Sequence, residues 1–151
     1  MKKSGIFFYV MLFALLFAGI TACTPANDDP ADPPTAAVNG FTWRENSTTA
    51  PLKTAGSSEV RTQYKSIFAF TGATPTSGTL FEFNLTGVTP GTYPVNASNA
   101  FYFDGNPATP VSGEVVITSN AAGKATGTFK ATWSGGGLTA VYGTFTNIPV
   151  N

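Results

Sequence analysis

The sequence contains no histidine and a single cysteine, Cys23, in 151 residues. The lack of histidine excludes every catalytic triad, catalytic dyad and metal site that depends on an imidazole. The single cysteine excludes a disulfide within the chain and leaves one thiol for covalent chemistry. We therefore expect no cofactor, no metal and no enzymatic activity.

Charged residues are also scarce, at 11% of the chain. Eight basic residues balance eight acidic ones, and two of the basic residues, Lys2 and Lys3, stand at the start of the chain. Without these two, six basic residues oppose eight acidic ones, for a net charge of −2. Binding of nucleic acid requires a clustered basic surface, so no nucleic-acid partner is expected.

The first 22 residues have the features of a secretory signal peptide. Lys2 and Lys3 form its positive start, and an apolar run follows from Ile6 to Ile20. This run of 15 residues is shorter than the roughly 20 that a membrane-spanning helix requires. The segment 1–22 is therefore predicted to be a cleaved signal peptide, and an uncleaved membrane anchor is the alternative.

The signal peptide ends in Ile20-Thr21-Ala22-Cys23, which resembles the bacterial lipobox. The resemblance implies cleavage between Ala22 and Cys23, a diacylglycerol on the sulfur of Cys23, and an acyl chain such as palmitate on its new amino group. Each buried methylene contributes about 0.8 kcal/mol, so such an anchor would hold the protein to a membrane. Thr24, and not aspartate, follows the cysteine, so the signal for inner-membrane retention is absent and the outer membrane is expected.

Residues 23–35 are rich in proline and aspartate and contain no large apolar side chain. Such a segment cannot bury surface, so it is predicted to be a disordered tether that reaches roughly 30–40 Å from the lipid. The pair Asp28-Asp29 resembles the acidic signal that sends some Bacteroidetes lipoproteins to the cell surface. The alternative is a solvated acidic spacer, and the choice between outward and periplasmic exposure stays open.

Residues 36–151 show short alternating patterns that are separated by turn-forming residues. In the clearest of them, Phe81, Phe83 and Leu85 share one parity, and polar side chains occupy the other. A period of two is typical of β-strands with one buried face. About eight to ten such strands and no amphipathic helix predict an all-β domain, either an antiparallel β-sandwich or a small β-barrel.

The aromatic residues divide into a predicted core and a few candidates for ligand binding. Nine phenylalanines are assigned to the core-facing parity: Phe41, Phe68, Phe70, Phe81, Phe83, Phe101, Phe103, Phe129 and Phe145. Tyr102 and Tyr142 fall on the opposite parity, where they could stack on a sugar ring or contact a partner protein. Trp43 or Trp133 could join them near a strand end. The alternative is that both tyrosines pack in a second, half-buried layer of side chains and bind no ligand.

Three stretches resemble a family of small Bacteroidetes lipoproteins that is known chiefly as a domain of unknown function. They are AAVNGFTWRENS near the start of the domain, FEFNLTGVTPGTYPVNASNAFYF at its centre, and Gly113–Pro149 at its end. The resemblance covers nearly the whole domain. It implies an all-β lipoprotein that carries a lipobox, and it supplies no catalytic residue.

The carboxylates of the domain offer one route to catalysis, a hydrolase with two acidic groups. The candidates are Glu45, Glu59, Glu82, Asp104 and Glu114. Glu82 and Glu114 lie on outward parities, so solvated strand faces are the better interpretation. Asp104-Gly105-Asn106 supplies too few oxygens for calcium and is predicted to be a turn, and Gly135–Gly137 is predicted to be a hairpin tip.

These features favour a lipid-anchored, non-catalytic envelope protein whose β-domain binds an extracellular glycan or a protein partner. A structural subunit of an outer-membrane assembly is the second hypothesis. A carboxylate-based hydrolase is a distant third.

Overall fold

The structure is a computed structural model, and it describes residues 39–75, 78–96, 99–108 and 111–151. These residues belong to one compact unit, Ala36–Asn151. The predicted signal peptide, Cys23 and the predicted tether lie outside the described residues.

The described residues form eleven strands and one short 3₁₀ helix. The elements are β1 (Gly40–Glu45), β2 (Lys53–Thr54), β3 (Ser57–Arg61), η1 (Thr62–Tyr64), β4 (Ser66–Phe70), β5 (Thr79–Asn84), β6 (Gly91–Val95), β7 (Phe101–Phe103), β8 (Asn106–Pro107), β9 (Val111–Ala121), β10 (Lys124–Trp133) and β11 (Ala140–Pro149). The all-β prediction is confirmed. The number of strands exceeds the predicted eight to ten because β2 and β8 have two residues each, too few to form an alternating pattern.

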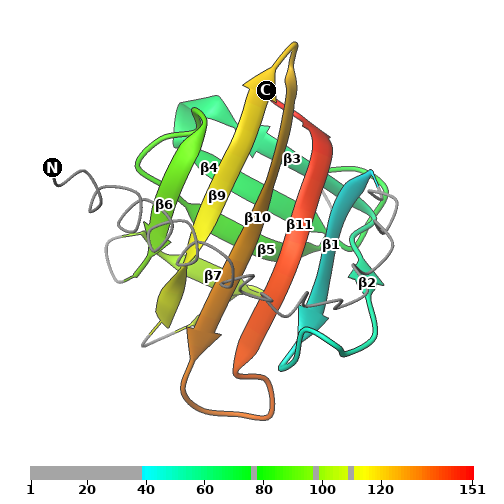
Figure 1. The fold of residues 1–151 in the computed structure, drawn as a ribbon. Coiled ribbons are helices and arrows are strands. Elements are labelled where there is room, and N and C mark those ends of the chain that lie inside the picture. Colours follow the sequence, from blue (N-terminus) through cyan, green and yellow to red (C-terminus); the bar gives the residue numbers. More distant parts are fainter. Residues whose placement is uncertain (1–38, 76–77, 97–98, 109–110) are drawn as a thin grey trace, which may run out of the picture. The chain divides into compact units, whose positions relative to one another are not determined.

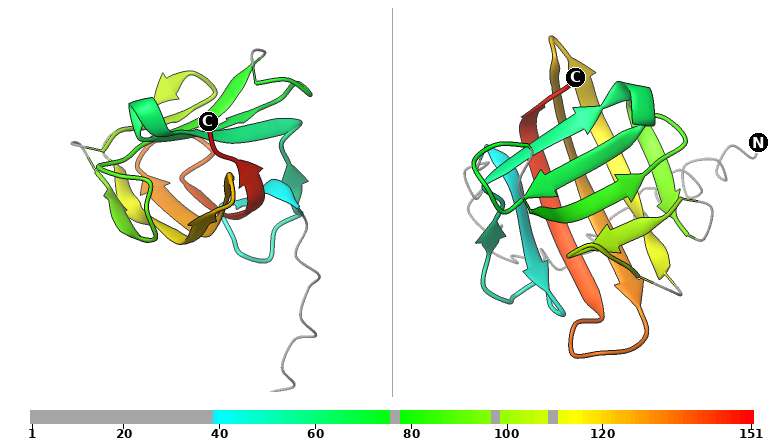
Figure 2. Two further views of the ribbon diagram at one scale, coloured as in Figure 1. Left: turned by 90° about the horizontal axis from the view of Figure 1, so that it is seen from above. Right: turned by 180° about the vertical axis from the view of Figure 1, so that it is seen from behind.

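The strands form two antiparallel sheets packed face to face (Figures 1 and 2). The front sheet has the order β2-β1-β11-β10-β9-β6, and the back sheet has the order β3-β4-β5-β7-β8. The strands of the back sheet cross behind those of the front sheet (Figure 1). Neither sheet closes on itself within the described residues, so the fold is the sandwich and not the barrel of the two predicted alternatives.

Alternation of apolar and polar side chains explains why these segments become half-buried strands. In β10, Ala125, Phe129 and Ala131 are buried, whereas Thr128 and Lys130 between them are exposed. The same period of two produces the predicted inward face of Phe81 and Phe83 in β5. Each strand therefore contributes one face to the space between the sheets.

Phenylalanine rings from both sheets are the largest fully buried side chains of the core, and smaller aliphatic side chains surround them. Phe41 of the front sheet lies 4.6 Å from Phe129 and 5.0 Å from Phe81 of the back sheet, measured between ring centroids. Phe83 and Phe101 stack within the back sheet at 4.7 Å. Large apolar rings in mutual contact bury much surface per residue, and this burial stabilises the packing of the two sheets.

Phe68 corrects the predicted core, because it lies half-buried on the outer side of β4. Phe70 is buried, as predicted, but it packs on Phe68 outside the main core cluster. Ile67 and Ala69 face the core and are fully buried. Phe68 stacks on Phe70 at 5.9 Å, and the guanidinium carbon of Arg61 lies 4.6 Å from the centre of the Phe68 ring. Both parities of β4 are apolar, so the sequence pattern alone does not show which side of the strand faces the core. On the outer side, the guanidinium of Arg61 lies over both phenylalanine rings and shields them from solvent.

One corner of the sandwich is joined by the residues that follow β11. Val150 forms a parallel bridge with Val60 of β3. The amide of Asn151 donates to the carbonyl of Val60 and the amide of Thr62 donates to the carbonyl of Asn151, both at 2.8 Å. The chain thus passes from the front sheet to the edge of the back sheet, at the end of β11 opposite the β10–β11 loop (Figure 1).

Candidate functional site

A pocket of about 440 Å³ lies where β7 and β8 approach the loop between β10 and β11. This loop is at the bottom of Figure 1. The described residues that line the pocket are Phe103, Asp104, Asn106, Ala108, Trp133, Ser134, Gly135, Gly136, Gly137 and Leu138. We refer to it as the loop-end pocket.

Two half-buried aromatic residues form an apolar part of the loop-end pocket. Phe103 is the last residue of β7 in the back sheet, and Trp133 is the last residue of β10 in the front sheet. Their ring centroids are 6.4 Å apart, with 31° between the ring planes. Trp133 also lies 5.6 Å from Phe101 of the core. The core therefore supports the two rings from behind and leaves part of each accessible.

A tight turn places polar groups beside these rings. Asp104 and Gly105 both have positive φ angles, 49° and 73°, as the centre of a two-residue hairpin turn requires. The side-chain amide of Asn106 donates to the carbonyl of Asp104 at 3.0 Å. The predicted turn at Asp104-Gly105-Asn106 is thus confirmed, and Asp104 is the only ionisable side chain among the described lining residues.

The β10–β11 loop forms the opposite wall of the pocket. The amide of Trp133 donates to the carbonyl of Thr139 at 2.9 Å and closes the base of the loop. Gly135 and Gly136 have φ angles of 104° and 80°, and no atom lies within 4 Å of the position that a Cβ would take. The prediction of a glycine hairpin tip is confirmed, and the tip borders the pocket.

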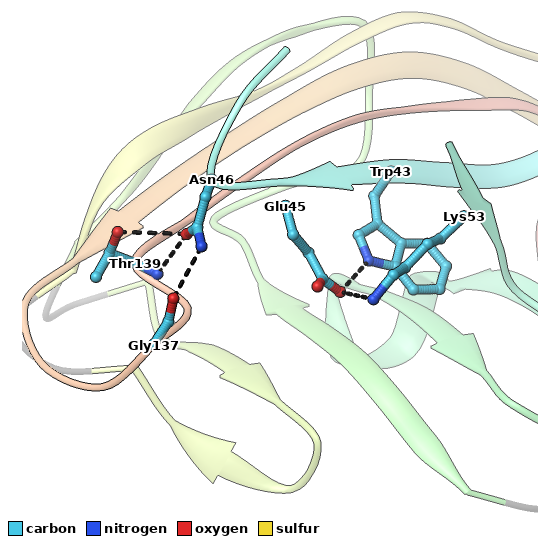
Figure 3. Close-up of polar contacts among 6 residues, drawn as sticks. All are labelled: Trp43, Glu45, Asn46, Lys53, Gly137 and Thr139. Atoms are coloured by element: carbon cyan, nitrogen blue, oxygen red, sulfur yellow. Dashed lines mark hydrogen bonds and ion pairs between the residues drawn. The ribbon is translucent and has the colours of Figure 1, made fainter. Parts of the chain in front are cut away.

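Asn46 contacts this loop although it follows β1. Its side-chain amide donates to the carbonyl of Gly137 at 2.8 Å, and its side-chain oxygen accepts from the amide of Thr139 at 2.8 Å (Figure 3). Residue 46 has a φ of 61°, a conformation that asparagine adopts more readily than most residues. No local sequence pattern predicts this role, because Gly137 and Thr139 lie more than 90 residues away along the chain.

The structure does not bring together the two tyrosines that were predicted to face a ligand. Tyr102 lies on the outer face of the back sheet, opposite Glu82 of β5. Tyr142 lies on the outer face of the front sheet, between Arg44 of β1 and Lys130 of β10. Both are half-buried, and neither is among the residues that line the loop-end pocket.

The two tryptophans have different positions. Trp133 lines the pocket at a strand end, the position considered for it from the sequence. Trp43 is 5% exposed, packs against Phe81 at 5.0 Å, and donates its indole N–H to Glu45 at 3.0 Å (Figure 3). Trp43 is therefore a core residue with a satisfied polar group.

The carboxylates are distributed over separate parts of the sandwich. Glu45 forms an ion pair with Lys53, and Glu59 is nearly buried beside Arg61. Burial raises the pKa of Glu45. Hydrogen bonds from Lys53 and Trp43, together with the charge of Lys53, lower this pKa by more than burial raises it, so the net shift is downward. The described residues contain no group of three or more side chains that could hold a metal ion.

The fold and the loop-end pocket define the class of this protein as a two-sheet β-sandwich with an aromatic pocket at one loop end. Comparisons with family models, curated proteins and solved structures give no match. Among the described residues, no helix has the length and apolar character needed to cross a membrane.

Proposed function

We propose that this protein is a lipid-anchored outer-membrane lipoprotein whose β-sandwich is a non-catalytic module that binds a glycan. The observation that carries the glycan proposal is the pair Phe103 and Trp133 in the loop-end pocket, with Asp104 and Asn106 beside it. The volume of about 440 Å³ falls within the roughly 300–1,000 Å³ typical of small-ligand sites.

A sugar ring has the chemistry that such a pocket would recognise. Its C–H face is apolar and slightly positive, so it packs against the electron-rich face of an aromatic ring. Its hydroxyls require hydrogen-bond partners, which the carboxylate of Asp104, the side chain of Asn106 and the backbone of the glycine loop can supply. No lysine or arginine is among the described lining residues, so a neutral sugar fits better than an acidic one.

The proposed location rests on the sequence of residues 1–35. The short apolar run, the lipobox-like Ile20-Thr21-Ala22-Cys23 and the lack of another cysteine support lipidation at Cys23. Thr24 supports the outer membrane, and Asp28-Asp29 supports exposure at the cell surface. The resemblance to small Bacteroidetes lipoproteins belongs to the same proposal.

A protein partner is the second candidate function, and an open strand edge favours it. β6 pairs only with β9 among the described strands, so its other edge could accept a strand from another chain. Pro94 in the middle of β6 lacks an N–H, which weakens such pairing. The glycan proposal therefore ranks first.

The loop-end pocket gives no support to a hydrolase with two acidic groups, because its described lining contains one carboxylate.

A glycan array with the soluble domain from Ala36 to Asn151 tests this function. We expect binding to neutral glycans, and Trp133→Ala should weaken it at least about tenfold because an aromatic contact is worth about 1.4 kcal/mol or more. Tyr142→Ala is the matched control and should bind like the wild type, since Tyr142 lies on another face. A blank array, or equal binding by Trp133→Ala, would refute the proposal.

A further inference from the structure

We infer that Asn46 is a positioning residue for the loop-end pocket, because it fixes one end of the β10–β11 loop and leaves the other end free to close over a ligand. The inference rests on the proposed binding function, since it concerns the same pocket. It assigns a role to a residue that lies 93 positions from Thr139 in the sequence.

Asn46 holds the β11 end of the loop with a set of hydrogen bonds. Its side-chain oxygen accepts from the Thr139 amide at 2.8 Å, and from the Thr139 hydroxyl and the Ala140 amide at 3.3 Å each. Its side-chain N–H donates to the carbonyl of Gly137 at 2.8 Å. The backbone amide of Asn46 also donates to the carbonyl of Ala140 at 2.8 Å. Figure 3 shows how the side chain reaches across to Gly137 and Thr139.

An asparagine suits this position for two separate reasons. The primary amide offers a donor and an acceptor on one planar group, and the loop uses both. Residue 46 has a left-handed backbone, with φ of 61°, which glycine and asparagine tolerate better than most other residues. Aspartate would keep the acceptor and lose the donor to Gly137, and glycine would keep the backbone and lose every side-chain bond.

The β10 end of the loop has no such fixation. Ser134, Gly135 and Gly136 are exposed, and within the described part of the chain they make no hydrogen bond. The two glycines have open space around them and positive φ angles, so this half can change conformation at little steric cost. The loop is therefore a lid with one fixed end, and Gly137 and Leu138 next to the fixed end keep a constant wall of the pocket.

Fixation at one end reduces the part of the loop that a ligand must order. A ligand has to immobilise Ser134–Gly136 and not the whole loop, so less conformational entropy is lost on binding. Loss of the Asn46 side chain would release the Gly137 carbonyl and the Thr139 amide as well, and the affinity of the pocket should then fall.

Amide hydrogen exchange of the full chain in detergent micelles tests the fixation without any ligand. In Asn46→Gly, which keeps the left-handed backbone, exchange at Thr139 and Ala140 should accelerate at least about tenfold. Asn46→Asp should retain much of the protection at Thr139, because its carboxylate still accepts. Ser47→Ala is the matched control, since the Ser47 hydroxyl bonds among the described residues only to Thr49, and it should leave both amides unchanged. Unchanged exchange at Thr139 in Asn46→Gly would overturn the inference.

Titration with methyl β-D-glucopyranoside, a neutral sugar, links the fixation to binding. In the wild type the sugar should shift the amide resonances of Gly135 and Gly136. Asn46→Gly should bind it about tenfold more weakly and should still unfold in a single cooperative thermal transition. Equal affinity of the two proteins would refute the positioning role. A wild type that binds no sugar would count against the proposed function instead, while hydrogen exchange would still decide whether Asn46 fixes the loop.

Discussion

Two glycines at the centre of the front sheet make room for two phenylalanine rings. In the strand register Gly143 lies opposite Phe129, and Gly127 lies opposite Phe145. A Cβ at Gly143 would lie 2.2 Å from the ring of Phe129, and a Cβ at Gly127 would lie 2.4 Å from the ring of Phe145. Each ring thus covers the bare backbone of its cross-strand neighbour, an arrangement that compensates for the missing side chain.

Replacement of Gly143 by alanine should destabilise the domain by about 1–3 kcal/mol, because the added methyl group overlaps both the Phe129 ring and the carbonyl of Thr42. Urea unfolding of residues 36–151 measures the change. Gly137→Ala is the control, since nothing lies within 4 Å of its Cβ position and its stability should stay within about 0.5 kcal/mol of the wild type. Equal unfolding midpoints for Gly143→Ala and the wild type would contradict the packing argument.

The sequence predicted the residues that a regular pattern controls and missed those that depend on contacts between distant segments. The inward positions of Phe81, Phe83 and Phe129 follow from a period of two, and they were predicted correctly. Asn46 could not be found this way, because nothing local indicates that its side chain reaches Gly137 and Thr139. Its φ above zero is a property of the folded backbone and does not follow from residue type alone.

At the scale of elements, the strands with one apolar parity were predictable and the others were not. β5 and β10 alternate clearly, whereas β4 is apolar on both parities, and Phe68 was wrongly assigned to the core. The loop-end pocket combines the ends of β7 and β10, which belong to different sheets. The turn-forming residues after β7 and β10 predict where each strand ends. The two ends lie side by side only because the two sheets pack face to face, which the sequence pattern does not show.

The edge strand β2 is held to β1 by an ion pair that should respond to pH. Lys53 of β2 contacts Glu45 of β1 at 2.7 Å, with 50% and 25% of the two side chains exposed. The pKa of Glu45 is lower in the folded protein than its ordinary value of 4.5, so the ionised carboxylate favours the folded state. This contribution is complete above that ordinary value and is lost as the pH falls through the lower, folded-state value.

Glu45→Gln should therefore be less stable than the wild type at neutral pH, by at most about 1 kcal/mol for so exposed a pair. The difference should shrink as the pH is lowered below 4.5. Urea unfolding at a series of pH values measures it, with Glu114→Gln as the control because Glu114 is exposed on the outer face of the front sheet. A difference that does not depend on pH would show that the ion pair is not its source.

At the scale of the whole molecule, the proposed function combines a lipid anchor at the N-terminal side with a binding module, the β-sandwich. The proposed membrane anchoring depends on Cys23, which lies outside the described residues. The proposed ligand binding depends on the end of the sandwich that carries the loop-end pocket. The predicted tether of residues 23–35 would lie between the lipid and the module, so each function can be tested without the other.

Cys23→Ser should abolish labelling of the protein with radioactive palmitate, because the proposed acceptor sulfur and the cleavage site are both lost. Thr24→Ala, with an intact Cys23, should remain labelled and serves as the control. An immunoblot of the same samples confirms that both variants are produced. Labelling that persists in Cys23→Ser would refute lipidation at this residue.

The pairing of β1 with β11 has a consequence for the order of events in folding. The register joins Gly40 to Thr146, so the first and last strands of the domain are neighbours within the front sheet. Contacts between residues so far apart in sequence close large loops and slow the search for the native state. The front sheet cannot be completed until almost the whole domain is present, so a growing chain would remain unfolded until late. The predicted secretory signal peptide implies export across a membrane, and a chain that is exported before it folds would benefit from that delay.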